Sequence, residues 1–96
     1  GLGTLIVKNK FKNTTGIITD GDVKRISNMN KDFKNLKIKK VMKKKPISVD
    51  KNMLAVEALS IMNSKKITSL CVHQNKNKNK TIGFIHIHSI LDANIT

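Results

Sequence analysis

The stretch GIITDGD, from Gly16 to Asp22, is an apolar run that ends in polar residues and leads into a helix-favouring segment, 23–26. Where a strand runs into a helix, the first turn has unpaired backbone N–H groups at the positive end of the helix dipole, and such a junction can bind a small polar or anionic ligand. The spacing of Thr19 and Asp22 also fits a capping box, in which the hydroxyl and the carboxylate satisfy those N–H groups. From these residues alone both interpretations stay open, and capping is the simpler one.

Length and composition indicate one small folded domain. The chain has 96 residues, of which 39% are hydrophobic, enough for an aliphatic core. We expect no membrane association, because no apolar run approaches the about 18 residues of a membrane span. The start of the chain also lacks the pattern of a signal peptide. The single cysteine, Cys71, lies in an apolar run, so we expect it to be buried and reduced, which fits the cytoplasm.

The charge does not predict a nucleic-acid partner. The net charge is +13, but it comes almost entirely from lysine, and Arg25 is the only arginine. Arginine is the residue favoured for bidentate contacts to phosphate and guanine, and no aromatic residues are interleaved with the lysines to stack on bases. Lysine, asparagine and isoleucine are encoded by A/T-rich codons, so a biased genome explains the composition. We therefore expect no nucleic-acid binding.

Hydrophobic periodicity and turn residues predict two hairpins, each followed by a helix. We expect the helix 20–29 to bury Val23, Ile26 and Ser27, and the run Lys43 to Lys45 to be a linker. The helix 53–64 should begin at a cap formed by Asp50 or Asn52. Its buried face is predicted to contain Leu54, Ala58, Ile61 and Met62. The remaining predictions are strands at 2–7, 15–19, 47–49, 67–72 and 81–87, a one-turn helical segment within 36–42, and a last helix at 89–93.

An internal repeat relates the two halves of the chain. Each copy has an apolar strand, a Lys/Asn turn, a glycine, a second apolar strand and a short helix. The matched positions are 5–7 with 70–72, Gly16 with Gly83, Thr19 with His86, and Asp22 with Ser89. A strand and a helix precede the second hairpin and have no counterpart before the first, so the first copy reads as truncated at its N-terminus.

This duplicated β-α-β-β-α unit, with Gly-apolar-apolar-Thr-x-x-Asp at the end of a strand, resembles a tandem pair of CBS domains. The implied fold class is α/β, of the α+β kind, with residues 1–40 as a partial first repeat and 41–96 as the second. The chain further resembles the C-terminal region of bacterial D-arabinose-5-phosphate isomerases. The motifs that carry this likeness are 1–4, 16–25, 41–42, 54–59, Met62, 66–69 and 86–88.

The resemblance implies a non-catalytic regulatory module. In the family, an N-terminal sugar-isomerase domain interconverts ribulose 5-phosphate and arabinose 5-phosphate for the lipopolysaccharide sugar Kdo. This chain has neither a Ser/His/Asp arrangement nor paired carboxylates for such chemistry, so we expect no catalysis. CBS pairs bind adenosine nucleotides or related ligands in the cleft between repeats. AMP, ATP or CMP-Kdo are thus implied as regulatory ligands, with no required cofactor. The alternative is a ligand-free dimerisation module, and either way a homodimer through the CBS helices is implied.

The resemblance also assigns roles to residues. Asp22 would accept hydrogen bonds from ribose hydroxyls, Thr19 would contact the phosphate or ribose, and Gly21 would allow close approach of the backbone. Arg25, with its neighbour Lys24, would meet phosphate. Three apolar residues would flank a base: Ile17, Ile47 and Leu70.

The second repeat departs from the pattern, because His86 and Ser89 occupy the threonine and aspartate positions. Ser89 can form hydrogen bonds but lacks the charge that holds a diol. His86 and His88 lie two residues apart on a predicted strand, a spacing that can hold a metal ion. A third ligand is not evident beside them, and we expect no metal.

Overall fold

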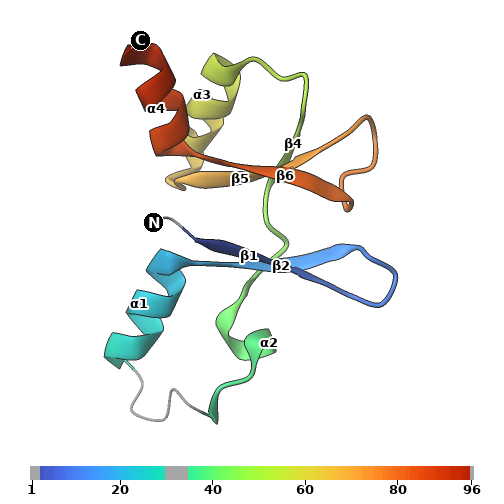
Figure 1. Ribbon diagram of the computed structural model, residues 1–96, viewed down its shortest axis with the longest axis vertical. Helices are drawn as coiled ribbons and strands as arrows, with labels where there is room; N and C mark the ends of the chain where they lie inside the picture. Colours follow the sequence, from blue (N-terminus) through green and yellow to red (C-terminus); the bar gives the residue numbers. More distant parts are fainter. Residues whose placement is uncertain (1–2, 30–34, 96) are drawn as a thin grey trace. The chain divides into compact units, whose positions relative to one another are not determined.

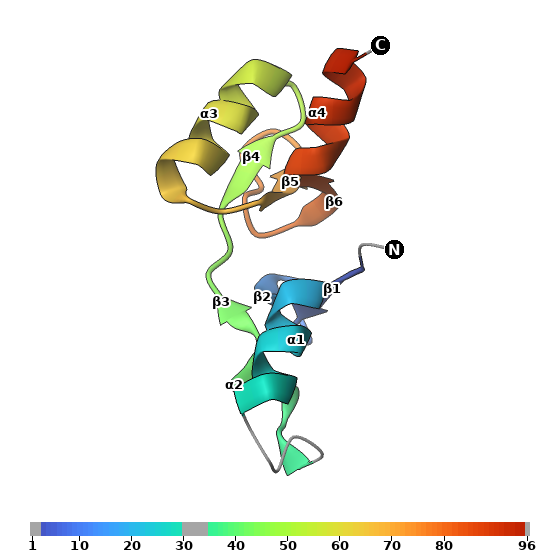
Figure 2. The same cartoon turned by 90° about the vertical axis from the view of Figure 1, so that its left-hand side faces the viewer.

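The computed structural model describes residues 3–29 and 35–95, and within these ranges it describes the side chains of 3–28 and 35–91. The chain divides into two compact units, Gly1–Pro46 and Ile47–Thr96. The boundary between the units follows Pro46, later in the sequence than the predicted boundary between residues 40 and 41. The assignment of residues 1–40 and 41–96 to two repeats stays a prediction. Each unit contains a small sheet with helices (Figures 1 and 2).

The first unit is built on a hairpin. Its elements are β1 (Thr4–Lys8), β2 (Thr14–Thr19), α1 (Asp20–Met29), α2 (Ile38–Val41) and β3 (Lys43–Lys44). The sheet order is β1-β2-β3, and both pairings are antiparallel. The predicted strands and the helix 20–29 are confirmed, as is the one-turn helix. The prediction that 43–45 is a linker is wrong for Lys43 and Lys44, which pair with Ile17 and Gly16 of β2.

Gly16 allows this close pairing of β2 with β3. A Cβ atom at Gly16 would lie 2.8 Å from the carbonyl oxygen of Lys43, closer than real Cβ contacts come. A side chain here would therefore push β3 away from β2. The glycine thus keeps Lys43 beside the end of the hairpin.

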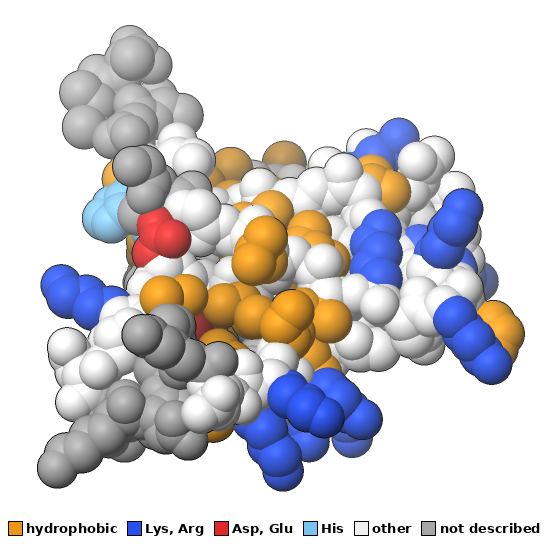
Figure 3. Space-filling view, turned by 60° about the horizontal axis from the view of Figure 1, so that its bottom comes forward, with side chains coloured by type: hydrophobic (Ala, Val, Ile, Leu, Met, Phe, Trp, Pro, Cys, Tyr) orange, Lys and Arg blue, Asp and Glu red, His pale blue; other side chains and the backbone are white. Residues whose placement is uncertain are grey.

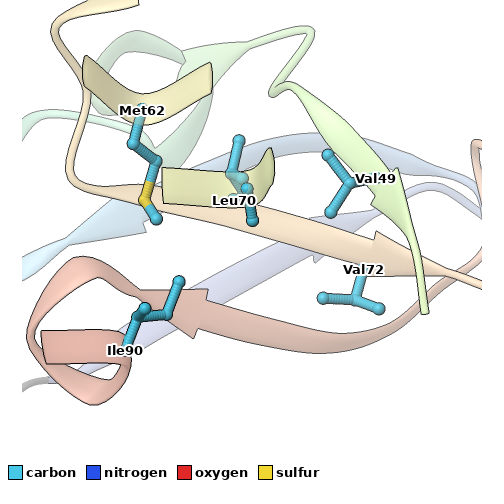
Figure 4. Close-up of a cluster of buried hydrophobic side chains, with 6 residues drawn as sticks. Val49, Met62, Leu70, Val72 and Ile90 are labelled. Carbon is cyan, nitrogen blue, oxygen red and sulfur yellow. The ribbon is translucent and has the colours of Figure 1, made fainter. Parts of the chain in front are cut away.

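The second unit has the sheet order β4-β5-β6, with β4 parallel to β5 and β6 antiparallel to it. Its elements are β4 (Ser48–Asp50), α3 (Ala55–Lys65), β5 (Ser69–His73), β6 (Thr81–His86) and α4 (Ile87–Ile95). Residues from β4, both helices and β5 form its core (Figure 4), namely Val49, Ala58, Met62, Leu70, Val72 and Ile90. Cys71 is buried with a free thiol, as predicted. Burial raises the pKa of the Cys71 thiol, although a hydrogen bond with the Thr81 side chain acts against the shift.

The cap predicted for α3 is wrong. The N-cap position is Leu54, which has no side-chain capping bond. The Asp50 carboxylate instead accepts a hydrogen bond of 2.8 Å from the N–H of Asn52, within the turn that precedes the helix. The helix is terminated by its C-cap Lys66, which has a left-handed φ of 56° and whose N–H donates to the carbonyls of Asn63 and Met62.

Three predicted core residues are exposed. Leu54 is 63% exposed and Val23 is 41% exposed. Ser27 is also exposed, and its hydroxyl donates a hydrogen bond of 2.8 Å to the carbonyl of Val23. Helical spacing identifies an apolar stripe but does not show that another element covers it. Of the other predicted core residues, Ile26, Ala58 and Met62 are buried, and Ile61 packs against the core of the second unit.

The internal repeat is confirmed by the strand register. Thr4 pairs with Thr19 at one end of the first hairpin, as Ser69 pairs with His86 in the second. The register shifts directly after Val7 and directly after Val72, so the irregularity also repeats. The two sheets differ beside the equivalent strands β1 and β5. β5 has β4 as a second neighbour, whereas β1 is an edge strand of its sheet.

The surface is rich in lysine. Figure 3 shows apolar side chains exposed at the surface and many Lys and Arg side chains projecting from it. Among the described residues, no helix is long and apolar enough to cross a bilayer.

Candidate functional site

The junction of β2 and α1 carries the capping box that the sequence predicts. The backbone N–H and the hydroxyl of Thr19 each donate a hydrogen bond of 2.9 Å to Oδ2 of Asp22. The N–H of Asp22 returns a longer bond of 3.3 Å to Oγ1 of Thr19. These reciprocal bonds satisfy donors at the helix start and fix the rotamers of both side chains.

The second oxygen of Asp22 faces two cations. Oδ1 lies 3.4 Å from Nη2 of Arg25, one turn along α1, and 3.4 Å from Nζ of Lys43, on β3. The Asp22 side chain is 2% exposed, whereas both cationic side chains are largely exposed. The site therefore holds one buried carboxylate beside two largely exposed positive charges.

Electrostatics favour the ionised form of Asp22. Burial acts to raise the pKa of its carboxyl. The hydrogen bonds from the backbone and side chain of Thr19, together with the charge of Lys43, outweigh this effect and hold the pKa of Asp22 below its ordinary value. The carboxylate thus keeps a full negative charge near neutral pH.

Neighbouring residues tie the junction to the start of the chain. The backbone N–H of Gly3 donates a hydrogen bond of 2.7 Å to Oδ2 of Asp20. Gly21 is exposed in the first turn of α1 and does not have a positive φ. Its absent side chain leaves the first turn open, which is compatible with the close backbone approach predicted for it.

The three apolar candidates have different surroundings. Ile17 is buried in β2, and Leu70 lies in the core of the second unit with 1% of its surface exposed. Ile47, just before β4, is the only one of the three with an exposed side chain. Core packing therefore accounts for the side chains of Ile17 and Leu70.

The junction of β6 and α4 has different chemistry. Nδ1 of His86 accepts a hydrogen bond of 3.2 Å from the N–H of His88, so the imidazole acts as a cap acceptor. The two rings stack with centroids 4.8 Å apart and an interplanar angle of 24°. Ser89, at the position equivalent to Asp22, is exposed. In the part of the chain that the structure describes, no three His, Cys, Asp or Glu side chains gather as a metal site.

Sequence reasoning missed Lys43. Lys43 lies in the predicted linker, and its ion pair with Asp22 joins residues far apart in the sequence. Lysines also occur throughout the chain, so the residue type alone does not single it out. The only signal is its position after the apolar pair Val41-Met42, and that signal is weak.

In a comparison with known families, the family described as CBS domain matches residues 38–95. Among curated relatives, arabinose 5-phosphate isomerase KdsD of Yersinia pestis is 37% identical over 94 residues. The protein of the same name from Escherichia coli K12 is 36% identical over 94 residues. In both cases the match covers 98% of this chain and 28% of the relative, so the chain spans little more than a quarter of their length.

Solved structures share the fold at lower identity. The CBS domain NE2398 has a TM-score of 0.81 and 24% identity, over 98% of this chain and 71% of that one. The CBS domain pair of MJ0100, solved with 5-methylthioadenosine and S-adenosyl-L-methionine, has a TM-score of 0.78 and 18% identity, over 97% and 72% of the two chains. CBSX2 in complex with AMP has a TM-score of 0.72 and 19% identity, over 96% and 70%.

Proposed function

This chain belongs to the CBS-domain family, and on that premise we propose that it is a non-catalytic regulatory module of an arabinose-5-phosphate isomerase. It binds an adenosine nucleotide or a nucleotide-sugar and adjusts the activity of the enzyme that contains it. The regulatory ligand is AMP, ATP or CMP-Kdo. The module acts in the cytoplasm.

The likeness to the isomerases supports the first part of the proposal. Identity of 36–37% extends over nearly the whole chain in proteins named arabinose 5-phosphate isomerase. Because the match covers 28% of those proteins, the isomerisation and its sugar-phosphate substrates belong to the remaining part. An N-terminal sugar-isomerase domain of the same protein is then the partner of this module.

The solved CBS structures support the ligand class. Two proteins of this fold were solved with AMP or with adenosine-containing ligands. Here Asp22 holds the ribose diol, Thr19 and the open turn at Gly21 accommodate the ligand beside it, and Arg25 meets phosphate. Ile47 flanks the base, and His86 and Ser89 contribute hydrogen-bonding groups. The inter-repeat location of the site stays a prediction.

The observation that carries the proposal is the Asp22 carboxylate. It is ionised and held through Oδ2, and among the described residues its Oδ1 is contacted by two cations, each at 3.4 Å. This separation exceeds the about 2.7–2.9 Å of a strong charge-assisted bond, so Oδ1 keeps capacity to accept hydrogen bonds from ligand hydroxyls.

Calorimetric titration of the chain with AMP, ATP and CMP-Kdo tests the proposal. We expect saturable binding of at least one ligand and a loss of at least about tenfold in affinity in Asp22→Ser, which installs the residue of the second repeat. The control Asp20→Asn alters an exposed acid of the same turn and should bind as the wild type does. Absence of binding by all three ligands, or equal binding by Asp22→Ser, contradicts the proposal.

A dimerisation module is the second candidate, favoured by exposed apolar side chains on the helices of the second unit. Leu54, Val56 and Leu91 are exposed at or within α3 and α4. Large exposed apolar side chains close together are typical of interfaces between protein chains. Light scattering would report a homodimer that Val56→Lys dissociates, whereas a monomer at all concentrations would rule this function out.

A further inference from the structure

Within the described part of the chain, Lys43 is the cation that reaches Asp22 from outside α1. Its backbone is held in β3 opposite Ile17, and its ammonium lies 3.4 Å from Oδ1 of Asp22. We propose that Lys43 is an internal counter-ion that competes with the ligand for Asp22, so that the site selects phosphorylated ribosides over the uncharged nucleoside. This inference rests on the proposed function and specifies the ligand class of the same site.

The burial of Asp22 makes competition necessary. The carboxylate is 2% exposed, and Oδ2 is already occupied by both donors of Thr19. A ligand hydroxyl can therefore reach only Oδ1, which Arg25 and Lys43 flank. One of the two cations must move before a diol can bind there.

Lys43 is the cation that moves. Arg25 is on the same helix as Asp22, three residues away, and its planar guanidinium also lies within hydrogen-bond reach at 3.4 Å. Lysine is instead a point charge on a flexible stem, and the Lys43 side chain is largely exposed. Rotation of this stem frees Oδ1 and leaves β3 in place.

Displacement of Lys43 sets the specificity. An uncharged nucleoside displaces the Lys43 ammonium from the Asp22 carboxylate and offers the ammonium no new anionic partner, so it binds weakly. A phosphate on the same ligand provides a new anionic partner for the freed ammonium and for the exposed Arg25, and so offsets the lost ion pair. The second repeat has no such device, because Ser89 replaces the carboxylate.

Calorimetry with adenosine and AMP tests this inference. In the wild-type chain we expect AMP to bind at least about tenfold more tightly than adenosine. Lys43→Met keeps the aliphatic stem and removes the charge. This substitution should tighten adenosine binding and weaken AMP binding, so that the ratio of AMP affinity to adenosine affinity falls about tenfold. The matched control Lys44→Met changes the next residue of β3 and should leave the ratio unchanged.

The outcomes separate the two proposals. If Lys43→Met leaves both affinities unchanged while Asp22→Ser weakens both, the counter-ion role is wrong and the proposed function stands. If neither adenosine nor AMP binds to the wild type, the counter-ion inference fails, and the proposed function fails with it only if ATP and CMP-Kdo do not bind either. A carboxyl NMR titration of Lys43→Met gives an independent readout, since loss of the ammonium should raise the pKa of Asp22, and an unchanged pKa contradicts the pairing.

Discussion

The β2–α1 and β6–α4 junctions have the same backbone frame and different side chains. Each follows a hairpin with the same register and the same irregularity, after Val7 in one and after Val72 in the other. The first helix start is capped by a carboxylate that also attracts two cations, whereas the second is capped by the imidazole of His86. The repeated fold thus fixes where a polar group stands, and the residue types decide what it can bind.

A second contrast concerns what covers each hairpin. Leu5 and Leu70 occupy equivalent positions, opposite Ile18 and Ile85. Leu70 is 1% exposed beneath α3 residues such as Met62, whereas Leu5 is 62% exposed on an edge strand. The same residue in the same register therefore contributes very differently to stability.

Truncation of these two leucines gives the largest expected effect. Leu70→Ala removes buried atoms from the core of the second unit and should reduce the free energy of unfolding by about 2–5 kcal/mol. Leu5→Ala acts at an exposed site and should cost less than about 1 kcal/mol. Urea unfolding of both variants measures the difference, and equal losses would show that the hairpins are covered alike.

Removal of the two junction side chains should have a smaller effect. Asp22→Ala leaves the Thr19 donors and both cations without their acceptor, and should cost about 1–3 kcal/mol. Ser89→Ala alters an exposed residue and should change stability by no more than about 0.5 kcal/mol. Thermal unfolding distinguishes the two, and a larger loss in Ser89→Ala would contradict the stabilising role assigned to Asp22.

The acid limb of the stability profile should show the smallest effect. Because the pKa of Asp22 in the folded chain lies below its ordinary value of 3.8, its ionised form stabilises the fold fully above that value. The contribution is lost as the pH falls through the lower folded pKa. Urea unfolding between about pH 6 and pH 2.5 should therefore decline more steeply for the wild type than for Asp22→Asn. Parallel profiles would contradict the lowered pKa.

The sequence was sufficient for local features of the fold. Short apolar runs separated by polar turns predict both hairpins, and the spacing of Thr19 and Asp22 predicts the capping box, because strand pairing across a turn and helix capping depend on near neighbours. The internal repeat adds the equivalence of the two junctions, which the register confirms.

Non-local features could not be predicted in this way. β3 has only two residues, too few for a periodic pattern, and its Lys43 meets Asp22 across the fold. Val23 and Leu54 lie on apolar stripes, but their burial depends on whether another element covers them. The capping role of His86 depends on which way its ring turns, and the sequence does not specify a rotamer.

Our central claim is that the β2–α1 junction binds the nucleotide through Asp22. The most direct test is an amide NMR titration of the ¹⁵N-labelled chain with AMP, which maps binding without any substitution. We predict saturable shifts that are largest for residues 19–25 and Lys43. The absence of shifts with AMP, ATP and CMP-Kdo alike, or shifts confined to the β6–α4 junction around Ser89, would contradict it.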